Sequence, residues 1–333
     1  PWRGKAEQLA SFRSTLNKWQ KLTGWPIFAD PLSGVENSQN GLINHWDLIF
    51  SIGFFERINE IQVLRLGPLP PSQNLKFWLE KPGRSQLLIT EGDYRNLDPI
   101  GGSIQFSEGF SYWLNKFSDS ISKNPATDNK NLSKRLTSKL INYDLFINDW
   151  LDKKLFGKGL ITEPALARLL PRLVPNSIPV MLASSSPIRD WLSYSGEGAF
   201  IRRCFGFRGA SGIDGTLSMG MGLSIIMGRM ILVTGDLALL HDTNGWLFSK
   251  DKNISLIVIM IDNGGGGIFN QLNIDTIQEG DFKEIFLMPQ QVCHLTLAKA
   301  YGLKYKQVAC LDDLEQAIEW SFSLSTNVLI RVC

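Results

Sequence analysis

Two segments decide the fold of this chain: residues 230–236, MILVTGD, and residues 254–263, ISLIVIMIDN. Each is an apolar run of strand length that ends in side chains carrying oxygen, Asp236 in the first and Asp262 and Asn263 in the second. Strands that are apolar at successive positions are typical of parallel sheets covered by helices on both faces. We therefore predict that both segments are central strands of an α/β domain.

The rest of the chain alternates strand and helix patterns, which predicts parallel sheets. Further strands are expected at residues 25–30, 60–66, 86–90, 179–183 and 328–332. Helices are expected at residues 7–22, 45–50, 242–250, 295–301 and 312–321, and others begin near residues 75 and 162. The expected fold class is α/β, with two doubly wound parallel-sheet domains. Residues 1–124 and 161–333 form these domains, and the polar, Lys-rich residues 125–160 form a linker with a helix.

Composition excludes several classes of protein. The 333 residues carry 34 Lys and Arg against 32 Asp and Glu, a formal net charge of +2 that argues against a dedicated nucleic-acid binder. Three histidines are too few for a His-rich metal site, and the four cysteines form no C-x-x-C pair, which indicates a reducing, cytoplasmic compartment. No apolar run approaches the roughly 18–20 residues of a membrane span. The chain starts at Pro1 without a signal peptide, and we expect this start to lie inside a longer polypeptide.

Asp236 and Asn263 are the first candidates for a site. They lie 263 − 236 = 27 residues apart, about one loop–helix–loop–strand unit, so both are expected at the carboxyl edge of the sheet, where ligands bind. Hard oxygen ligands suit Mg²⁺, and the glycines at 264–267 allow a backbone carbonyl to approach as a third ligand. A helix starting near Ile268 and Phe269 would offer N–H groups to an anion. Together these features predict a metal-bridged diphosphate.

Each feature alone has a plainer interpretation. A Gly-Asp pair after a strand is usually a turn, four glycines are often a flexible loop, and Asp262 beside Asn263 is able to cap a helix. The combination, in this order and after apolar strands, favours the metal site. A dinucleotide-binding G-x-G-x-x-G fingerprint is not convincing here, because the acidic residue expected about 20 positions later is missing.

Longer motifs carry a resemblance to a known family. Residues 235–237, GDL, followed by residues 263–265, NGG, resemble the thiamine-diphosphate signature, which begins Gly-Asp and ends in Asn. Residues 208–215, RGASGIDG, and 263–269, NGGGGIF, resemble the 2-succinyl-5-enolpyruvyl-6-hydroxy-3-cyclohexene-1-carboxylate (SEPHCHC) synthases of menaquinone and phylloquinone biosynthesis. The resemblance covers the whole chain. It is strong after Pro179 and looser before, where residues 25–30 and 92–99 resemble the family's middle domain.

The resemblance implies thiamine diphosphate and Mg²⁺ (or Mn²⁺) as cofactors. It assigns the metal to Asp236, Asn263 and the carbonyl of Gly265, and it makes Ile213 the apolar wedge that bends the cofactor. The implied cofactor-binding residues are Ile213, Gly235, Asp236, Leu237, Asn263, Gly265, Ile268 and Phe269. The implied substrate-binding residues are Ser185, Arg189 and Arg208.

The charge of the implied substrates agrees with two arginines in the pocket. Guanidinium groups bind carboxylates through two parallel hydrogen bonds, and both implied substrates are polyanions. For either arginine taken alone, a surface ion pair is the commoner role, and Asp190 directly follows Arg189. For Ile213 alone, a core position after a turn is the plainer interpretation.

The implied reaction is decarboxylation of 2-oxoglutarate and addition of the resulting carbanion to isochorismate, giving SEPHCHC and carbon dioxide. The implied partners are these small molecules and further copies of the chain, as a dimer or tetramer, without nucleic acid or membrane. Members of the family have three domains, and the chain matches the middle one, truncated at its start, and the diphosphate-binding one. The activating Glu would lie in the pyrimidine-binding domain, so the resemblance implies no catalytic residue here and an inactive isolated chain. Gln73 departs from a Lys that is common in relatives.

Two alternatives stay open. An acetolactate-synthase or decarboxylase relative would share the Gly-Asp…Asn pattern but not the run at 208–215 together with Arg189. A non-catalytic nucleotide- or flavin-binding module would use the glycine run as a phosphate cradle. A purely structural scaffold is disfavoured by two oxygen ligands directed at one sheet edge.

Overall fold

The chain folds into two compact units, which are described separately. The computed structural model describes residues 4–58, 60–123, 127–156, 159, 161–207, 211–271 and 278–333. Contacts assign Pro1–Lys153 and Ala199–Ile201 to the first unit, and Lys154–Gly198 and Arg202–Cys333 to the second. Among the described residues, no helix combines the length and the apolar character that crossing a membrane requires.

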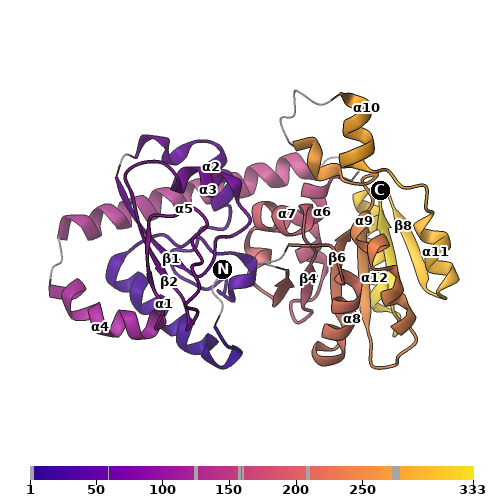
Figure 1. The fold of residues 1–333 in the computed structure, drawn as a ribbon, viewed down its shortest axis with the longest axis horizontal. Coiled ribbons are helices and arrows are strands. Elements are labelled where there is room, and N and C mark those ends of the chain that lie inside the picture. Colours follow the sequence, from indigo (N-terminus) through magenta and orange to yellow (C-terminus); the bar gives the residue numbers. More distant parts are fainter. Residues whose placement is uncertain are drawn as a thin grey trace. The chain divides into compact units, whose positions relative to one another are not determined.

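The first unit is built on a parallel sheet in the order β1-β2-β3, comprising Ile61–Leu66, Arg84–Ile89 and Ser103–Phe106 (Figure 1). Its helices are η1 (Ala6–Gln8), α1 (Leu9–Thr23), η2 (Pro31–Ser33), α2 (Trp46–Ser51), η3 (Phe54–Arg57), α3 (Gln73–Leu79), α4 (Phe110–Lys123) and α5 (Thr127–Leu155). Gln73 is the first, exposed residue of α3, which Ser72 caps by accepting a hydrogen bond from the N–H of Leu75.

The long helix α5 lies within the segment expected as a linker, and polar contacts hold it to the first unit. The hydroxyl of Thr137 donates to the carbonyl of Gly24 at 2.7 Å, and an oxygen of Asp144 accepts from the backbone N–H of His45 at 2.7 Å. Burial disfavours the charge of Asp144, but its hydrogen bonds with His45 lower its pKa. These contacts explain why α5 belongs to the first unit as far as Lys153.

The strand expected at residues 25–30 is wrong. Ile27 makes a single parallel bridge to Leu42, and the carbonyl of Ala29 accepts from the indole N–H of Trp46 at 2.9 Å. Because a side chain takes up this carbonyl, the apolar segment packs as an irregular loop and not as part of the sheet.

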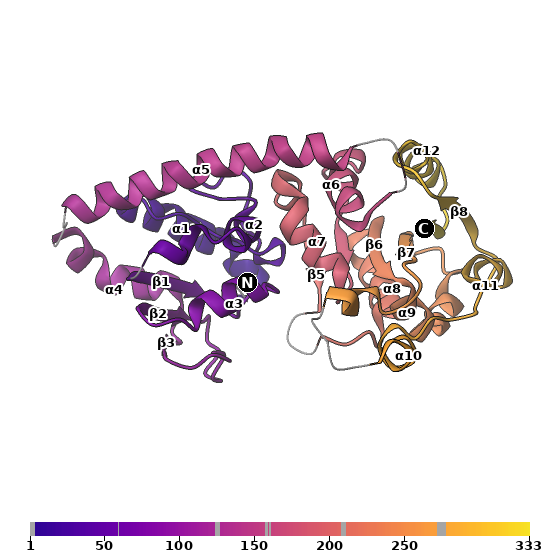
Figure 2. The same ribbon diagram turned by 90° about the horizontal axis from the view of Figure 1, so that it is seen from above.

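The second unit is a parallel sheet of six strands in the order β5-β4-β6-β7-β9-β8. The strands are β4 (Val180–Leu182), β5 (Cys204–Gly206), β6 (Met230–Gly235), β7 (Leu256–Ile261), β8 (Lys304–Val308) and β9 (Val328–Val332). All six residues of β7 are buried, as the apolar run predicted. Figure 2 shows α6, α7 and α12 on one face of this sheet and α8, α9 and α11 on the other, so the expected doubly wound α/β fold is confirmed in this unit.

The second unit contains both α-helices and shorter helical turns. The helices are α6 (Glu163–Leu173), α7 (Ser186–Tyr194), η4 (Gly196–Ala199), α8 (Thr216–Met227), α9 (Asp236–His241), η5 (Thr243–Phe248), η6 (Gly267–Gln271), α10 (Glu279–Phe282), η7 (Lys283–Leu287), α11 (His294–Ala300) and α12 (Leu311–Phe322). The helices expected at residues 242–250 and from Ile268 are instead the 3₁₀ turns η5 and η6. Apolar side chains of β6 and β7, including Leu232 and Val258, form a core with Leu217 and Met221 of α8.

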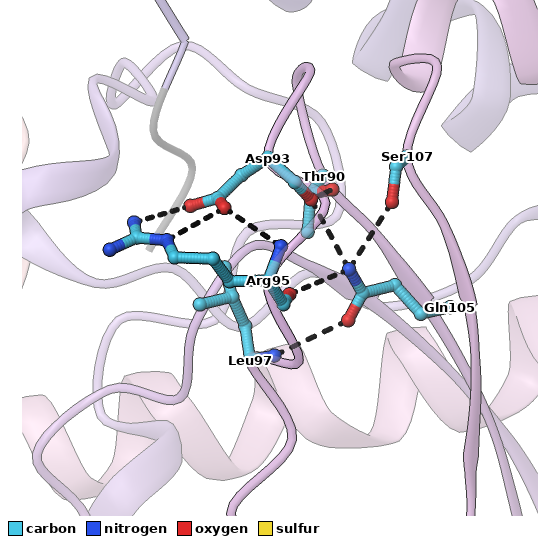
Figure 3. Close-up of polar contacts among 6 residues, drawn as sticks. All are labelled: Thr90, Asp93, Arg95, Leu97, Gln105 and Ser107. Carbon is cyan, nitrogen blue, oxygen red and sulfur yellow. Dashed lines mark hydrogen bonds and ion pairs between the residues drawn. The ribbon is translucent and has the colours of Figure 1, made fainter.

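The loop after β2 is tied to β3 by one carboxamide (Figure 3). The amide nitrogen of Gln105 donates to the carbonyls of Asp93 and Arg95, at 3.2 and 2.9 Å, and its oxygen accepts from the N–H of Leu97 at 3.3 Å. The side chains of Asp93 and Arg95 also form an ion pair. The motif at residues 92–99 is therefore an ordered loop whose backbone polar groups are bound by its own domain.

The same loop ends at a buried ion pair. Asp98 accepts from the guanidinium of Arg65 at 2.6 Å and from the N–H of Ser103 at 3.1 Å, and the side chains of Asp98 and Arg65 are only 4% and 5% exposed. Burial disfavours the charge of Asp98, but these hydrogen bonds and the charge of Arg65 lower its pKa to about 2. The pair fixes the loop to strand β1.

Replacing Asp98 by Asn should reveal this pair as a pH-dependent contribution to stability. The folded pKa lies below the unfolded one, so the charge contributes about 2 kcal/mol above pH 5, and about half of this is lost by pH 3. Asp98→Asn also leaves the Arg65 charge buried without a carboxylate, so it should cost at least about 2 kcal/mol at pH 7. Urea unfolding at pH 7 and pH 3 measures the gap between the two proteins.

The exposed Asp149 of α5 provides the control. Asp149→Asn should unfold like the original protein at both pH values. A gap between the original protein and Asp98→Asn that stays constant from pH 7 to pH 3 would contradict the assignment.

Candidate functional site

The carboxyl ends of β6 and β7 bring two aspartates together. Gly235 at the end of β6 pairs with Ile261 at the end of β7, so the next residues, Asp236 and Asp262, leave the sheet side by side. The side chains of Asp236 and Asp262 interact directly, and the Asp262 carboxyl contributes to the raised pKa of Asp236. The edge of the sheet chosen from the sequence therefore carries a pair of adjacent carboxyl groups.

Asp236 is the desolvated member of this pair. It is 5% exposed at the first position of α9, and its Oδ1 accepts from the N–H of Leu237 at 2.7 Å. Burial, with a further contribution from Asp262, raises its pKa to about 6. Hydrogen bonds from the N–H groups of Leu237 and Gly265 act in the opposite direction and lower the pKa. A bound cation would relieve this cost, because it restores the favourable interactions that the carboxylate loses with water.

Asp262 already has a cationic partner. The guanidinium Nε of Arg331, on β9, donates to its Oδ2 at 2.7 Å, and the N–H of Gly264 donates to its Oδ1 at 3.3 Å. Burial disfavours its charge, but these contacts hold the pKa of Asp262 below its usual value. Sequence reasoning missed Arg331, although a charged residue inside the apolar strand 328–332 was a usable signal.

Close packing requires glycine at two positions of the run, Gly265 and Gly266. Gly264 and Gly265 have φ angles of 83° and 123°, which favour glycine. A Cβ on Gly265 would lie 2.0 Å from the carbonyl oxygen of Leu287, and one on Gly266 would lie 2.2 Å from that of Phe286. The N–H of Gly266 donates to the Leu287 carbonyl at 2.6 Å. The turn η7 thus closes directly onto the glycines.

Asn263 lies on the exposed side of this loop. Its amide Nδ2 donates to Oε1 of Glu163, the first residue of α6, at 2.7 Å. Ile268 is half-buried in η6, and the ring of Phe269 packs edge-on against that of Phe286, with centroids 5.5 Å apart. Within the described residues 267–271 the chain forms the 3₁₀ turn η6, and not the anion-binding α-helix expected from Ile268.

The expected substrate residues begin at the end of β4. Ser185 precedes α7 with a φ of 77°, a conformation that costs energy for a residue other than glycine. Its carbonyl accepts from the guanidinium of Arg189 at 2.7 Å, and burial lowers the pKa of Arg189. Burial, followed by interactions with Glu163, raises the pKa of Asp190 to about 8. Burial therefore disfavours the negative charge of Asp190, the neighbour of Arg189 in the chain.

Two further expected residues belong to the segment before α8. Arg208 lies outside the described residues. Ile213 is half-buried, and its carbonyl accepts from the hydroxyl of Thr216 at 2.8 Å. The roles expected for both residues stay predictions.

Comparison with known proteins identifies the second unit. Residues 186–332 match the family described as "Thiamine pyrophosphate enzyme, C-terminal TPP binding domain". Residues 186–332 of the second unit are therefore similar to the thiamine pyrophosphate-binding domain of these enzymes. The resemblance drawn from the Gly-Asp and Asn motifs is confirmed, and thiamine diphosphate is the cofactor that this family binds.

The whole chain is also similar to curated SEPHCHC synthases. It is 83% identical over 333 residues to the 2-succinyl-5-enolpyruvyl-6-hydroxy-3-cyclohexene-1-carboxylate synthase of Prochlorococcus marinus NATL1A, covering 100% of this chain and 56% of the relative. The synthases of Prochlorococcus marinus MIT 9313 and Synechococcus sp. CC9902 are 50% and 44% identical, with all of this chain and 57% of each relative covered. The chain thus spans little more than half the length of the curated relatives it matches.

The residues of this edge fit a metal-bound diphosphate. The fit rests on Asp236, a buried carboxylate that the structure leaves beside the backbone of Gly265. A carboxylate, a carboxamide and a carbonyl are oxygen donors of the kind Mg²⁺ takes alongside phosphate oxygens.

Alanine at Gly265 should open this loop. The new Cβ would meet the backbone of Leu287 and would also force a strained φ, at a cost of about 1–3 kcal/mol for the conformation alone. We expect the N–H of Gly266, which bonds to Leu287, to lose protection in hydrogen exchange.

Gly264→Ala is the matched control. It carries a similar φ penalty, but its Cβ would meet nothing within 4 Å. Gly264→Ala should therefore retain most of the protection at Gly266. Equal protection in the two variants would show that the contact with η7 does not hold the loop.

Proposed function

We propose that this chain provides the diphosphate- and metal-binding part of a SEPHCHC synthase. The reaction is the thiamine-diphosphate-dependent decarboxylation of 2-oxoglutarate and addition of the remaining four-carbon unit to isochorismate, giving SEPHCHC and carbon dioxide. The observation that carries the proposal is the buried carboxyl of Asp236, placed by the pairing of β6 with β7 against the N–H of Gly265. Similarity to the named synthases supports the choice of reaction.

Each residue of the site has a proposed task. Asp236, Asn263 and the carbonyl of Gly265 hold Mg²⁺ against the diphosphate, and Ile213 supports the bent cofactor. The remaining cofactor contacts are Gly235, Leu237, Ile268 and Phe269. The bound cofactor supplies an electron sink for the carbon that loses carbon dioxide.

Substrate recognition is proposed for the end of β4 and the segment before α8. Arg189 and Arg208 bind carboxylates through two parallel hydrogen bonds each, and Ser185 fixes the position of Arg189 through its carbonyl. Arg189 is half-buried, so its interactions with a carboxylate are less screened by water than those of a surface arginine.

The proposed domain arrangement and assembly rest on the resemblance to the same family. We propose that residues 1–124 correspond to the middle domain, 125–160 to the linker and 161–333 to the diphosphate-binding domain. The activating Glu is proposed to lie in a pyrimidine-binding domain, and the working assembly is a homodimer or homotetramer in the cytoplasm.

Removing the carboxylate of Asp236 should abolish metal-dependent cofactor binding. Asp236→Asn should weaken Mg²⁺ binding by more than the 10–100-fold typical of an outer-shell loss, because it removes the charged ligand. Isothermal titration of the full chain with thiamine diphosphate, with and without Mg²⁺, measures the effect. Asp312→Asn, an exposed site on α12, should bind like the original chain. Mg²⁺-independent binding, or preference for a flavin or dinucleotide, would favour the nucleotide-binding alternative.

Substrate profiling separates the SEPHCHC synthase from an acetolactate-synthase relative. The assay combines the chain with the segment of the 83% identical relative that it does not match, and follows carbon dioxide release and product mass. We expect product from 2-oxoglutarate with isochorismate and none from pyruvate. Turnover of pyruvate would support the alternative, and turnover by the chain alone would contradict the proposed position of the activating Glu.

A further inference from the structure

The carboxamide of Asn263 is held between two groups from different parts of the second unit. On one side its Nδ2 donates to Oε1 of Glu163 at 2.7 Å, although 100 residues separate the two in the chain. The carboxamide also lies close to Gly267, where an added Cβ would be 2.6 Å from Nδ2 and 2.7 Å from Cγ of Asn263. An exposed Asn would otherwise rotate freely, so the hydrogen bond to Glu163 selects one orientation of the carboxamide.

The chemistry of the two groups determines which orientation is selected. An ionised carboxylate only accepts hydrogen bonds, so it attracts the NH₂ end of a carboxamide and turns the oxygen away. Only that oxygen is a ligand for a hard cation such as Mg²⁺. Resting on the proposed function above, we propose that Glu163 is a positioning residue that directs the oxygen of Asn263 to the metal.

The backbone of Glu163 is well fixed for this task. It is the first residue of α6, after Thr162, whose hydroxyl accepts from the N–H of Ala165 at 3.3 Å, and Pro164 follows within the first turn. Ala165, like most of the helix, is buried against the domain. An anchored helix start limits the positions that the Glu163 side chain is able to take.

A second carboxyl supports the side chain of Glu163. Asp190 of α7 forms a side-chain hydrogen bond with it, and burial above all raises the pKa of Asp190 to about 8. This contact ties the Glu163 side chain to α7, while Oε1 of Glu163 accepts from the amide of Asn263. Because Asp190 follows Arg189, Glu163 also links the proposed metal ligand to the helix that carries a proposed substrate residue.

The test measures Mg²⁺ affinity of the full chain by isothermal titration in the presence of thiamine diphosphate. Glu163→Ala should weaken Mg²⁺ binding roughly 10-fold or more, the usual effect of losing an outer-shell partner. Glu163→Gln should stay within about threefold, because its amide oxygen still accepts from Asn263. Glu315→Ala, at an exposed site on α12, is the matched control and should have no effect. Wild-type Mg²⁺ affinity in Glu163→Ala would overturn the proposal.

Gly267→Ala provides a second route that leaves α6 intact. Its Cβ should push the carboxamide away from Glu163, so Mg²⁺ affinity should fall as it does in Glu163→Ala. The double variant Glu163→Ala/Gly267→Ala should bind Mg²⁺ no more weakly than the single variant with the lower affinity, because both changes remove the same contact. Additive losses in the double variant would overturn the proposal. Asn263→Ala separates a failure of the proposed metal site from a failure of the role proposed for Glu163. If Asn263→Ala also binds Mg²⁺ normally, the proposed metal site is wrong. If only Asn263→Ala loses affinity, the site stands and the role of Glu163 is wrong.

Discussion

The pairing of β6 with β7 is the constraint on which the site depends. In-register pairing of Gly235 with Ile261 brings Asp236 and the loop that begins at Asp262 to the same point of the sheet. The glycines then bring the backbone N–H of Gly265 close to the carboxyl of Asp236. The apolar strands are buried on both faces, and a shift of register would expose their side chains or disrupt the core. Moving Asp236 relative to the loop would therefore cost the free energy of disrupting the sheet.

The glycine loop is also constrained from outside the sheet. The carbonyls of Phe286 and Leu287 occupy the space that side chains on Gly266 and Gly265 would need. The segment 283–288 and the glycine loop therefore restrict each other's backbone conformation, and a change in one should alter the other. This explains the glycines at positions 265 and 266.

The sequence predicts the residues of this site better than it predicts the distant residues that contact them. Apolar runs and the spacing from Asp236 to Asn263 were enough to place both at one edge, because strand burial and parallel order are local signals. Glu163 and Arg331 contact the site from 100 and 69 residues away, and no periodicity shows which distant residue a polar side chain will meet. The wrong strand at residues 25–30 has a related cause: its composition suits a strand, but only Ile27 finds a partner.

The two aspartates show how the charges of the site are divided. Arg331 neutralises Asp262, so the pair and its arginine together carry one net negative charge when Asp236 is ionised. Without that arginine, two adjacent carboxylates would hold a divalent cation but would leave no positive charge to attract a diphosphate. With it, Asp236, Asp262 and Arg331 would present one net negative charge to a Mg²⁺ bound in the proposed site instead of two, which would lower the repulsion of a polyanionic cofactor. Arg331, which binds Asp262, therefore lowers the negative charge beside the proposed metal site.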